Sequence, residues 1–592
     1  MSDAPPKSPS FWSYFTQAET PRDPRPAGPG WFTNPAPPGT PGSESQTPCA
    51  LVFDRERIFW AMQNLPAVQA TKHFLICGTT GSGKSTAIEL FLRSIVPRIR
   101  SESGPPEQLI LYDPKCDVVP LLAALGLPPE DPRVWLLNPI DDRSAVWNVA
   151  EATSDPLLAR HFATLLVPEE KRSSSPYFAD AARELVYAVL LALHFVYGTN
   201  WKLRDLLCSL ESLERLRAVT DRHARAKALT ARVLSDHQHG GGVFSTLGTK
   251  LGKLEQVAAL WHTKSEPKEL SIEQFLLHSG VLILGDDPVL HDSFWPINAI
   301  LLKALTQQIL RRPNTLEPRH WFVLDEFRAM EKVDAIHDLL NRGRSKGASV
   351  LLGLQSIDGL LEVYGEHAAN DILSQCAHKT FLRAGGPVTA QWAERFFGKV
   401  RRTEPTLTES GRGLVKQKSV AYHIQERSLF TAAYFLDLPY PRPGANYSAV
   451  SDVPSLPHIL ITRRPFDQLL KWCHKSDEIE KKYPGVDLRE DEENKHLQPW
   501  TWDEEEFFCG RPVHLKKPVD ATQSEPAAKS EPASQPTKPA AAAATSEPAS
   551  EVKKPAPAAA PATSGGPIIP DENYPGKPPI GRKGRGGAAG RG

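Results

Sequence analysis

The sequence predicts an α/β protein in which a sheet-forming chain is interrupted by a helical insertion and flanked by tails that do not fold. Three observations support this prediction. Short apolar runs of strand length recur between residues 73 and 354. From about residue 153 to 275 they give way to helix-forming segments with 3.6-residue spacing. Residues 1–48 and 515–592 are too rich in proline, glycine or alanine to build a core.

Composition excludes few functions. Lys+Arg and Asp+Glu both number 69, so the net charge of zero neither supports nor excludes a nucleic-acid partner. The seven cysteines are scattered, with no CxxC pair, which favours a reducing compartment and no structural metal. The first fifty residues contain no apolar run, so no signal peptide is expected. The longest apolar run, residues 185–197, is too short to cross a bilayer and predicts a buried helix.

Residues 73–92 have the order strand, glycine-rich loop, helix. After the apolar run 73–77, eight residues match G-x-x-x-x-G-K-[ST]. Glycines allow successive backbone N–H groups to face one anion, and the start of the next helix favours phosphate at that point. A lysine and a hydroxyl here reach the β- and γ-phosphates and Mg²⁺. The predicted phosphate-binding residues are Gly78, Thr79, Thr80, Gly81, Ser82, Gly83, Lys84, Ser85 and Thr86.

The segments around this loop contribute further strands. Residues 51–69 are expected to form an entry strand and helix. Residues 108–112 predict a buried strand that ends in Asp113-Pro114-Lys115, and residues 134–137 predict a third strand. An acid and a base after a parallel strand are expected at the ligand edge of an open sheet, although a simple turn is an equal alternative.

The helical insertion contains a basic stretch: Arg215, Arg217, Arg222, Arg225, Lys227 and Arg232. These side chains can face a nucleic-acid backbone. A solvated helix face is an equal alternative.

The second half of the predicted site follows the insertion. Residues 280–285 and 321–324 predict strands, and the latter ends in Asp325-Glu326. A carboxylate that closes a buried strand beside a phosphate loop suits Mg²⁺, so Asp325 is predicted to lie on the magnesium side. Glu326 is placed to polarise an attacking water. The alternative is an acidic strand end with no catalytic role.

Two more positions complete a hydrolase set. Residues 341–347 form a polar, cationic loop from which an arginine can reach a transferring phosphoryl group. Residues 350–354 predict the next strand, and Gln355 at its end can hold the lytic water or sense the γ-phosphate. The alternatives are a solvated loop and an ordinary strand-end amide.

These motifs together resemble a known family. GTTGSGKST, DPK, the NP and WN pairs, VLDEF, NRGRSKG and LLGLQS come in the order found in type IV secretion coupling proteins of conjugation, within the HerA/FtsK lineage of P-loop ATPases. The resemblance covers roughly residues 50–470. It implies a RecA-like P-loop NTPase domain with an inserted all-α domain, assembled as a homo-hexamer that moves DNA using ATP and Mg²⁺.

The resemblance also assigns roles. It makes Lys84 and Ser85 the phosphate and Mg²⁺ ligands, and Asp325 the magnesium-side acid. Glu326 becomes the catalytic base, Arg344 an arginine finger entering the neighbouring subunit's site, and Gln355 the sensor. The chain departs from the family in two ways: it has no membrane helices at its start, and it has Cys116-Asp117 where Gly-Glu is frequent after DPK. A cytoplasmic location, at most peripheral at the inner membrane, is therefore expected.

The expected domain boundaries follow from these changes of character. Residues 1–48 are a disordered arm, 49–152 and 276–475 the two parts of the nucleotide-binding domain, and 153–275 the all-α insertion. A last helix is expected within residues 454–472. Residues 476–514 are an acidic, aromatic linker that either recruits a basic partner or is simply solvated. Residues 515–592 are a disordered tail, and the basic Gly/Arg sequence at its end is suited to loose nucleic-acid binding.

The predicted function is an ATP-hydrolysing DNA-translocating motor that passes DNA or nucleoprotein to a secretion channel. Its expected partners are DNA, relaxosome or secretion-channel proteins, and further copies of itself. One alternative is a DNA pump acting inside the cell. The other, from a different class, is a recruitment adaptor whose nucleotide site only switches conformation.

Overall fold

The computed structural model of the 592-residue chain describes residues 54–511 and 513, apart from residues 168–176, 236–239, 265–266, 331, 411–416, 457–458, 474–480 and 484. The expectations for the arm at 1–48 and for the tail at 515–592 lie outside the described residues.

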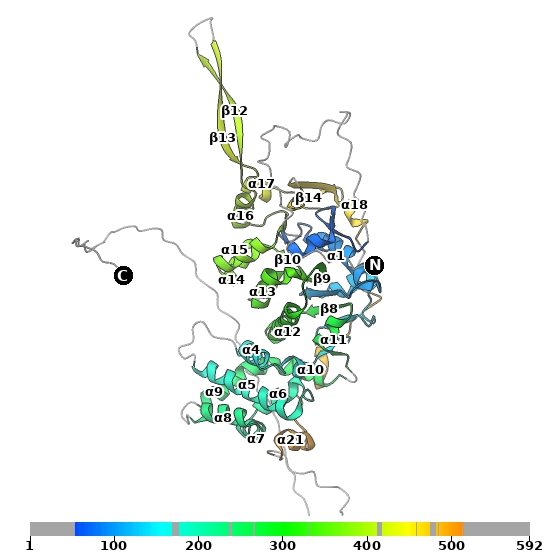
Figure 1. Ribbon diagram of the computed structural model, residues 1–592, viewed down its shortest axis with the longest axis vertical. Coiled ribbons are helices and arrows are strands. Elements are labelled where there is room, and N and C mark those ends of the chain that lie inside the picture. The colour runs from blue at the N-terminus through cyan, green and yellow to red at the C-terminus, as the bar shows by residue number, and fades with distance from the viewer. Residues whose placement is uncertain are drawn as a thin grey trace, which may run out of the picture. The chain divides into compact units, whose positions relative to one another are not determined.

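A nine-stranded sheet forms the centre of the described chain (Figure 1). Its strand order is β15-β14-β11-β3-β10-β9-β4-β8-β5. The strands from β11 to β5 run parallel, whereas β14 and β15 pair antiparallel at one edge. The parallel strands are β3 (Phe74–Cys77), β4 (Gln108–Asp113), β5 (Val134–Leu137), β8 (Gly280–Gly285), β9 (Thr315–Leu324), β10 (Lys346–Leu354) and β11 (His378–Phe381).

Alternating side chains of the parallel strands enter two hydrophobic cores. In β3, Leu75 and Cys77 belong to one core, whereas Phe74 and Ile76 belong to the other. Helix α1 (Lys84–Arg100) packs into the second core, and α12 (His291–Arg311) and α13 (Asp334–Arg342) pack into the first. Strands buried on both faces often appear as continuous apolar runs, which explains why the sequence predicted all of these strands except β11, whose residues His378–Phe381 include a histidine, a lysine and a threonine.

The predicted helical insertion lies between two short strands. Its entry strand β6 (Val146–Trp147) pairs in parallel with its exit strand β7 (Glu269–Leu270), so the two ends of the insertion lie side by side. The helices between them are α3 (Val149–Ala152), α4 (Pro156–Leu166), α5 (Tyr177–Tyr197), α6 (Leu203–Leu210), α7 (Leu213–Thr220), α8 (Ala224–Leu234), α9 (Gly240–Leu251) and α10 (Glu255–His262).

The long apolar run forms the buried helix expected of it. Leu185, Val186, Val189 and Leu193 of α5 are each fully buried. No helix within the described residues has both the length and the apolar character needed to cross a membrane.

The structure differs from the sequence prediction at the two ends of the nucleotide-binding part. Instead of a strand and helix, the entry segment forms a hairpin of β1 (Arg57–Trp60) and β2 (Gln63–Pro66), followed by a 3₁₀ turn. The predicted closing helix is shorter than expected, because β15 (Leu460–Pro465) occupies the middle of that segment and, among its described residues, only α18 (Phe466–Leu470) is helical. β15 pairs with β14 (Asn446–Asp452).

A long hairpin between β11 and β14 was not predicted. Its strands, β12 (Lys399–Ser410) and β13 (Gln417–Ser428), pair along their whole length and extend away from the sheet (Figure 1). Most residues of the two strands are charged or polar, such as Lys399, Arg401 and Glu426, so no apolar run indicated them in the sequence. The described helices between β10 and β14 are α14 (Ile357–Tyr364), α15 (Glu366–Gln375), α16 (Pro387–Phe397) and α17 (Ala432–Leu436).

The acidic, aromatic segment is not a solvated linker. It contains helix α21 (Trp502–Cys509), which packs against the helical insertion. Trp500 is almost fully buried and stacks on Phe508 with ring centroids 4.8 Å apart. Arg204 donates hydrogen bonds to both carboxylate oxygens of Glu504 at 2.8 Å, which lowers the pKa of that carboxyl to about 2. Glu504 of the acidic segment is therefore paired with an arginine of the same chain.

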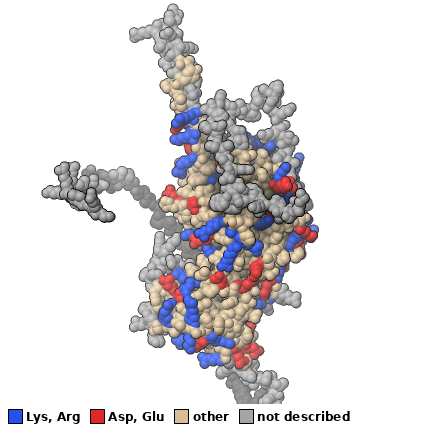
Figure 2. Space-filling model, in the orientation of Figure 1, with Lys and Arg blue, Asp and Glu red and all other residues tan. Residues whose placement is uncertain are grey.

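The basic stretch of the insertion is largely paired inside the chain. The buried Arg215 donates to the buried Glu505 at 2.8 Å, and Arg222 donates to the carbonyl of Phe507 at 2.8 Å. Lys227 lies 3.2 Å from Asp221, and Arg232 lies 3.4 Å from Glu184. Figure 2 shows basic and acidic side chains intermingled over the insertion on the face in view. These contacts favour structural roles over a phosphate-binding face.

Candidate active site

The predicted phosphate loop connects β3, which lies between β11 and β10 in the sheet, to α1. The N–H of Gly78 donates to the carbonyl of Leu354, at the end of β10, at 3.0 Å. The N–H of Thr79 donates to the carbonyl of Arg383, just after β11, at 2.9 Å. The loop is therefore held between the carboxyl ends of two neighbouring strands, which is where open parallel sheets bind ligands.

Glycine is required at three positions of this loop. Gly81 and Gly83 have φ values of 75° and 94°, a region that other residues rarely adopt. A Cβ on Gly83 would also lie 3.0 Å from the ring of Tyr447, and one on Gly78 would lie 2.5 Å from the hydroxyl of Ser82. The motif glycines thus fit a tightly packed turn as well as the dihedral angles.

The acid pair lies beside the loop lysine. Lys84 is almost completely buried, and its Nζ lies 3.1 Å from Oδ1 of Asp325 and 3.5 Å from Oε2 of Glu326. Asp325 and Glu326 directly follow β9, whose neighbour β10 lies next to β3. The sequence pattern placed these groups 241 and 242 positions apart in one pocket, and the structure brings them together.

Close packing and local strain mark the acid pair. A Cβ on Gly353 of β10 would lie 2.6 Å from Oδ1 of Asp325, so a glycine leaves room for that carboxylate. Glu326 has a φ of 59°, which is costly for a residue with a side chain. Residues held in such conformations cluster at functional sites, which favours a functional role for Glu326.

Gln355 joins the acid pair to the loop. Its Nε2 donates to Oε2 of Glu326 at 2.5 Å, and its Oε1 accepts a 3.5 Å hydrogen bond from the hydroxyl of Thr80. Gln355 follows β10 directly. The amide predicted at this strand end therefore contacts both the candidate base and the phosphate loop.

The residues after β4 bring a second lysine into the pocket. Nζ of Lys115 lies 3.5 Å from Oδ2 of Asp325. Asp113 accepts backbone N–H groups from Lys115, Asp117 and Val118, and burial raises the pKa of its carboxyl to about 6. The placement of this acid and base at the ligand edge is confirmed, and Asp113 acts as the acceptor that shapes the turn.

Arg344 is not part of this chain's own pocket. It precedes β10, whereas Gln355 follows that strand, so the nine residues of β10 separate them by about 30 Å. Arg344 is exposed beside a surface hollow of about 540 Å³ formed with Asn341, Arg342 and Lys346. Within one chain it cannot reach the phosphate loop.

Two contacts of the loop were missed by sequence reasoning. Besides accepting the N–H of Thr79, Arg383 donates to the carbonyl of Leu438 at 2.7 Å and lies 4.7 Å from the centre of the Tyr440 ring. Tyr440 also faces Gly81. The available signal was the short run 378–381 before Arg383, which forms the strand next to β3.

Residues 58–454 match the model of the family described as the type IV secretion-system coupling protein DNA-binding domain. The chain belongs to this family. The predicted family is thereby confirmed, and the match extends from the first strand of the entry hairpin to the residues just after β14.

Two curated relatives have similar names. The coupling protein TraD of Escherichia coli K12 is 22% identical over 408 residues, which cover 65% of this chain and 54% of TraD. The type IV secretion system-coupling protein VirD4 of Bartonella henselae is 22% identical over 388 residues, which cover 60% of this chain and 57% of VirD4. The chain thus spans a little over half the length of each of these relatives.

Solved structures of the conjugative coupling protein TrwB have the same fold. An unbound form of TrwB lacking its first part aligns with a TM-score of 0.54 at 18% identity, covering 69% of this chain and 88% of that chain. A complex of TrwB with a non-hydrolysable ATP analogue aligns with a TM-score of 0.53 at 18% identity, covering 69% of this chain and 89% of that chain. The predicted fold class, a P-loop α/β domain with a helical insertion, is confirmed.

Proposed function

We propose that the chain is an ATP-hydrolysing motor of the coupling-protein type that moves DNA or nucleoprotein towards a secretion channel. The observation that carries the proposal is the meeting of Lys84, Asp325 and Glu326 within 3.5 Å at the carboxyl edge of the parallel strands. The relatives support it: TraD and VirD4 are named coupling proteins, and TrwB has been solved with an ATP analogue and with ADP and Mg²⁺.

The residues of the pocket fit a triphosphate and Mg²⁺. Gly78 and Gly353 leave space that a Cβ would fill, and the buried Ser82 hydroxyl has no hydrogen-bond partner among the residues that the structure describes. Lys84 would exchange its carboxylate partners for the β- and γ-phosphates. Ser85, exposed in the first turn of α1, and Asp325 would hold the metal, which supplies positive charge to the phosphates.

Glu326 would accept the proton of the attacking water. A general base must lie within hydrogen-bond reach of the water and be held in position. The hydrogen bond from Gln355 and the constrained backbone of Glu326 support that role. Because Gln355 also contacts Thr80, it would report the state of the phosphate loop to the base.

Arg344 would complete the site of a neighbouring subunit. It is exposed and separated from Gln355 by the length of β10, about 30 Å, so it can serve catalysis only in trans. An arginine supplied across a subunit boundary stabilises transition-state charge and couples hydrolysis to assembly. We therefore include a homo-hexameric ring in the proposal.

The remaining parts of the proposal follow from the family. Residues 49–152 and 276–475 would form the nucleotide-binding domain and residues 153–275 its insertion. DNA and relaxosome or secretion-channel proteins would be the partners. The chain would act in the cytoplasm, with at most peripheral contact at the inner membrane.

An ATPase assay with and without single- and double-stranded DNA tests the proposal. We expect DNA-stimulated turnover by the full-length protein and its loss in Lys84→Ala, with Lys332→Ala, an exposed lysine outside the pocket, as the control. Nucleotide binding without turnover, stimulated or basal, would replace the motor by a recruitment adaptor.

A further inference from the structure

Tyr440 is an aromatic residue that lies half exposed beside the phosphate loop. Its side chain is 49% exposed, and a Cβ on Gly81 would lie 3.8 Å from its Cδ1, so one edge of the ring contacts the loop. The next aromatic residue along this segment, Tyr447, lies against Gly83 and is only 2% exposed. Tyr447 therefore belongs to the packing of the loop, whereas Tyr440 keeps ring surface open to a ligand.

The ring of Tyr440 is held in place by its neighbours. The guanidinium of Arg383 lies over one face, 4.7 Å from the ring centre, and Arg383 is itself fixed by a 2.7 Å hydrogen bond to the carbonyl of Leu438. Pro439 and Pro441 flank Tyr440 and restrict its backbone. A ring that is ordered before binding loses little conformational freedom when a ligand stacks on it. The open part of the ring is therefore a prepared surface.

Tyr440 and the acid pair lie on different sides of the phosphate loop. β3, which leads into the loop, pairs with β10 on one side and with β11 on the other. Gln355, after β10, bonds to Glu326, whereas Arg383, after β11, covers Tyr440. A triphosphate whose γ-phosphate faces Glu326 therefore directs its nucleoside towards the β11 side, where Tyr440 lies.

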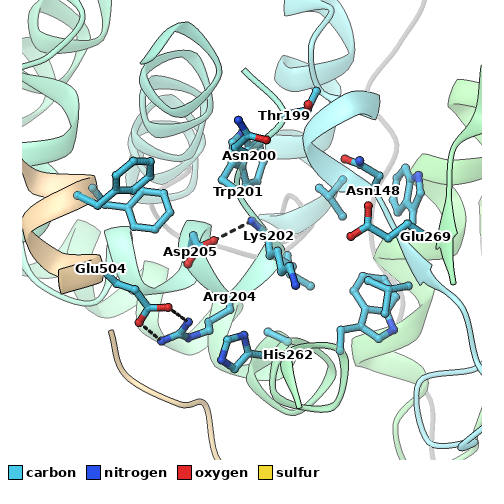
Figure 3. Close-up of a pocket in the computed structure, with 18 residues that line it drawn as sticks. Asn148, Thr199, Asn200, Trp201, Lys202, Arg204, Asp205, His262, Glu269 and Glu504 are labelled. Carbon is cyan, nitrogen blue, oxygen red and sulfur yellow. Dashed lines mark hydrogen bonds and ion pairs between the residues drawn. The ribbon is translucent and has the colours of Figure 1, made fainter. Parts of the chain in front are cut away.

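The cavity at the neck of the helical insertion offers a contrast. It measures about 450 Å³, and its wall includes Trp201, Arg204 and Glu504. Trp201 is 4% exposed, so the protein itself covers its ring, and Arg204 and Glu504 are bonded to one another (Figure 3). These three side chains are engaged within the protein, whereas Tyr440 presents open ring surface next to the loop.

We propose that Tyr440 stacks on the base of the bound nucleotide, so that the site takes nucleoside triphosphates and prefers purines. This inference rests on the proposed triphosphate site. Every base has a flat π-face that an aromatic ring accepts, and the larger purine ring system covers more of that ring than a pyrimidine does. Stacking does not read the edge of the base, so Tyr440 accepts adenine and guanine alike.

Isothermal titration calorimetry of the full-length protein with Mg²⁺ and a non-hydrolysable ATP analogue tests the proposal. We expect Tyr440→Ala to weaken binding about tenfold, because the variant loses the stacking of one base on one aromatic ring. Tyr440→Phe keeps the ring and should bind like the wild type. Tyr422→Ala, which removes an exposed tyrosine of the β12–β13 hairpin, should also bind like the wild type and serves as the control.

Two further ligands separate stacking from a change in the loop itself. Inorganic tripolyphosphate has no base, so Tyr440→Ala should bind it as tightly as the wild type does. The corresponding uridine analogue should bind the wild type about threefold more weakly than the ATP analogue, and this difference should disappear in Tyr440→Ala.

Three results would overturn the proposal: unchanged affinity of Tyr440→Ala for the ATP analogue, equal weakening of the ATP analogue and tripolyphosphate, or the same purine preference in the wild type and in Tyr440→Ala. Each of them leaves the triphosphate site in place. A wild type that binds none of the three ligands would instead overturn the proposed nucleotide site, and this inference with it.

Discussion

The two ends of the same parallel strands are built from different chemistry. At the carboxyl ends, Lys84, Lys115, Asp325 and Glu326 lie within 3.5 Å of an opposite charge. At the amino ends, His73 and His378 are buried, and desolvation lowers the pKa of each imidazole to about 4. One edge gathers charged groups around the phosphate-loop lysine, and the other buries these two neutral imidazoles.

The amino edge uses its polar groups to hold the backbone. The N–H of Val350 donates to Nδ1 of His73 at 3.2 Å, so Nε2 carries the proton and donates to the carbonyl of Leu340 at 3.1 Å. His378 stacks on Phe74 with ring centroids 4.7 Å apart, and its Nε2 bonds to the carbonyl of Gln69. A neutral imidazole with these partners links strand to strand.

Backbone strain alone does not separate the two edges. His73 has a φ of 59°, the same as Glu326. The difference lies in charge and exposure: Glu326 is 17% exposed beside a lysine, whereas His73 is 2% exposed among backbone groups. We therefore expect substitutions at the carboxyl edge to change turnover and those at the amino edge to change stability, with Arg344 as the exception.

Arg344→Ala should cause the largest loss of turnover. Arg344 lies at the amino end of β10, so a loss of catalysis there distinguishes its role from that of the other residues at the amino edge. An arginine finger contributes about 10³-fold or more to turnover, so kcat for ATP should fall by that factor while the melting temperature stays within about 2 °C of wild type. Arg342→Ala, an exposed neighbour, is the matched control.

Mixing two inactive variants shows whether this arginine acts in trans. An Arg344→Ala subunit keeps its lysine, and a Lys84→Ala subunit keeps its arginine, so a mixed ring contains some complete sites. Steady-state assays of the mixture should recover part of the turnover. No recovery, in a mixture shown to co-assemble, would contradict the trans assignment.

Glu326→Gln should give the next largest loss. Removing a general base lowers kcat by about 10²–10⁴-fold, while the amide keeps the size of the side chain and can still accept the hydrogen bond of Gln355. Nucleotide affinity, measured by fluorescence with a labelled ATP analogue, should change little. Glu362→Gln, an exposed glutamate paired with Arg328, serves as the control, and turnover equal to wild type in Glu326→Gln would assign the base elsewhere.

The amino edge predicts acid sensitivity without loss of activity. Because the imidazole pKa is about 4 in the folded state against 6.5 ordinarily, protonation of His73 and His378 favours the unfolded chain below pH 6.5. Each histidine should cost up to about 3 kcal/mol of unfolding free energy between pH 6.5 and pH 4, and nothing above pH 7.

His378→Gln sharpens that test. The amide can keep the hydrogen bond to the carbonyl of Gln69 but cannot titrate. Urea unfolding at several pH values should show a smaller loss of stability on acidification than in the wild type, from a lower starting value because the stacking on Phe74 is lost. If the pH dependence of stability is unchanged in this variant, the pKa of His378 in the folded protein is not lowered, and the histidine does not contribute to acid sensitivity.

The carboxyl edge could be predicted from the sequence, and the amino edge could not. Lys84, Asp325, Glu326 and Gln355 each follow a buried strand, and parallel strands bring their carboxyl ends to one edge whatever the strand order. His73 and His378 carry no local signal, because their partners are backbone groups of distant residues. The helix α21 was not predicted for a similar reason: its acids pair with arginines 300 and 290 positions earlier in the chain.

Gln355→Ala is the smallest and most discriminating substitution at the carboxyl edge. Gln355 is exposed, so its loss should not alter the melting temperature. It positions Glu326 through one 2.5 Å hydrogen bond, and a single hydrogen bond to a charged group contributes roughly 1.5–3 kcal/mol. Because Thr80 also contacts Gln355, the variant should lose about tenfold in kcat with little change in KM, whereas Thr80→Val should show a smaller loss of the same kind. A rise in KM at constant kcat would instead make Gln355 a nucleotide-binding residue. In that case Gln355 would not position Glu326 for catalysis.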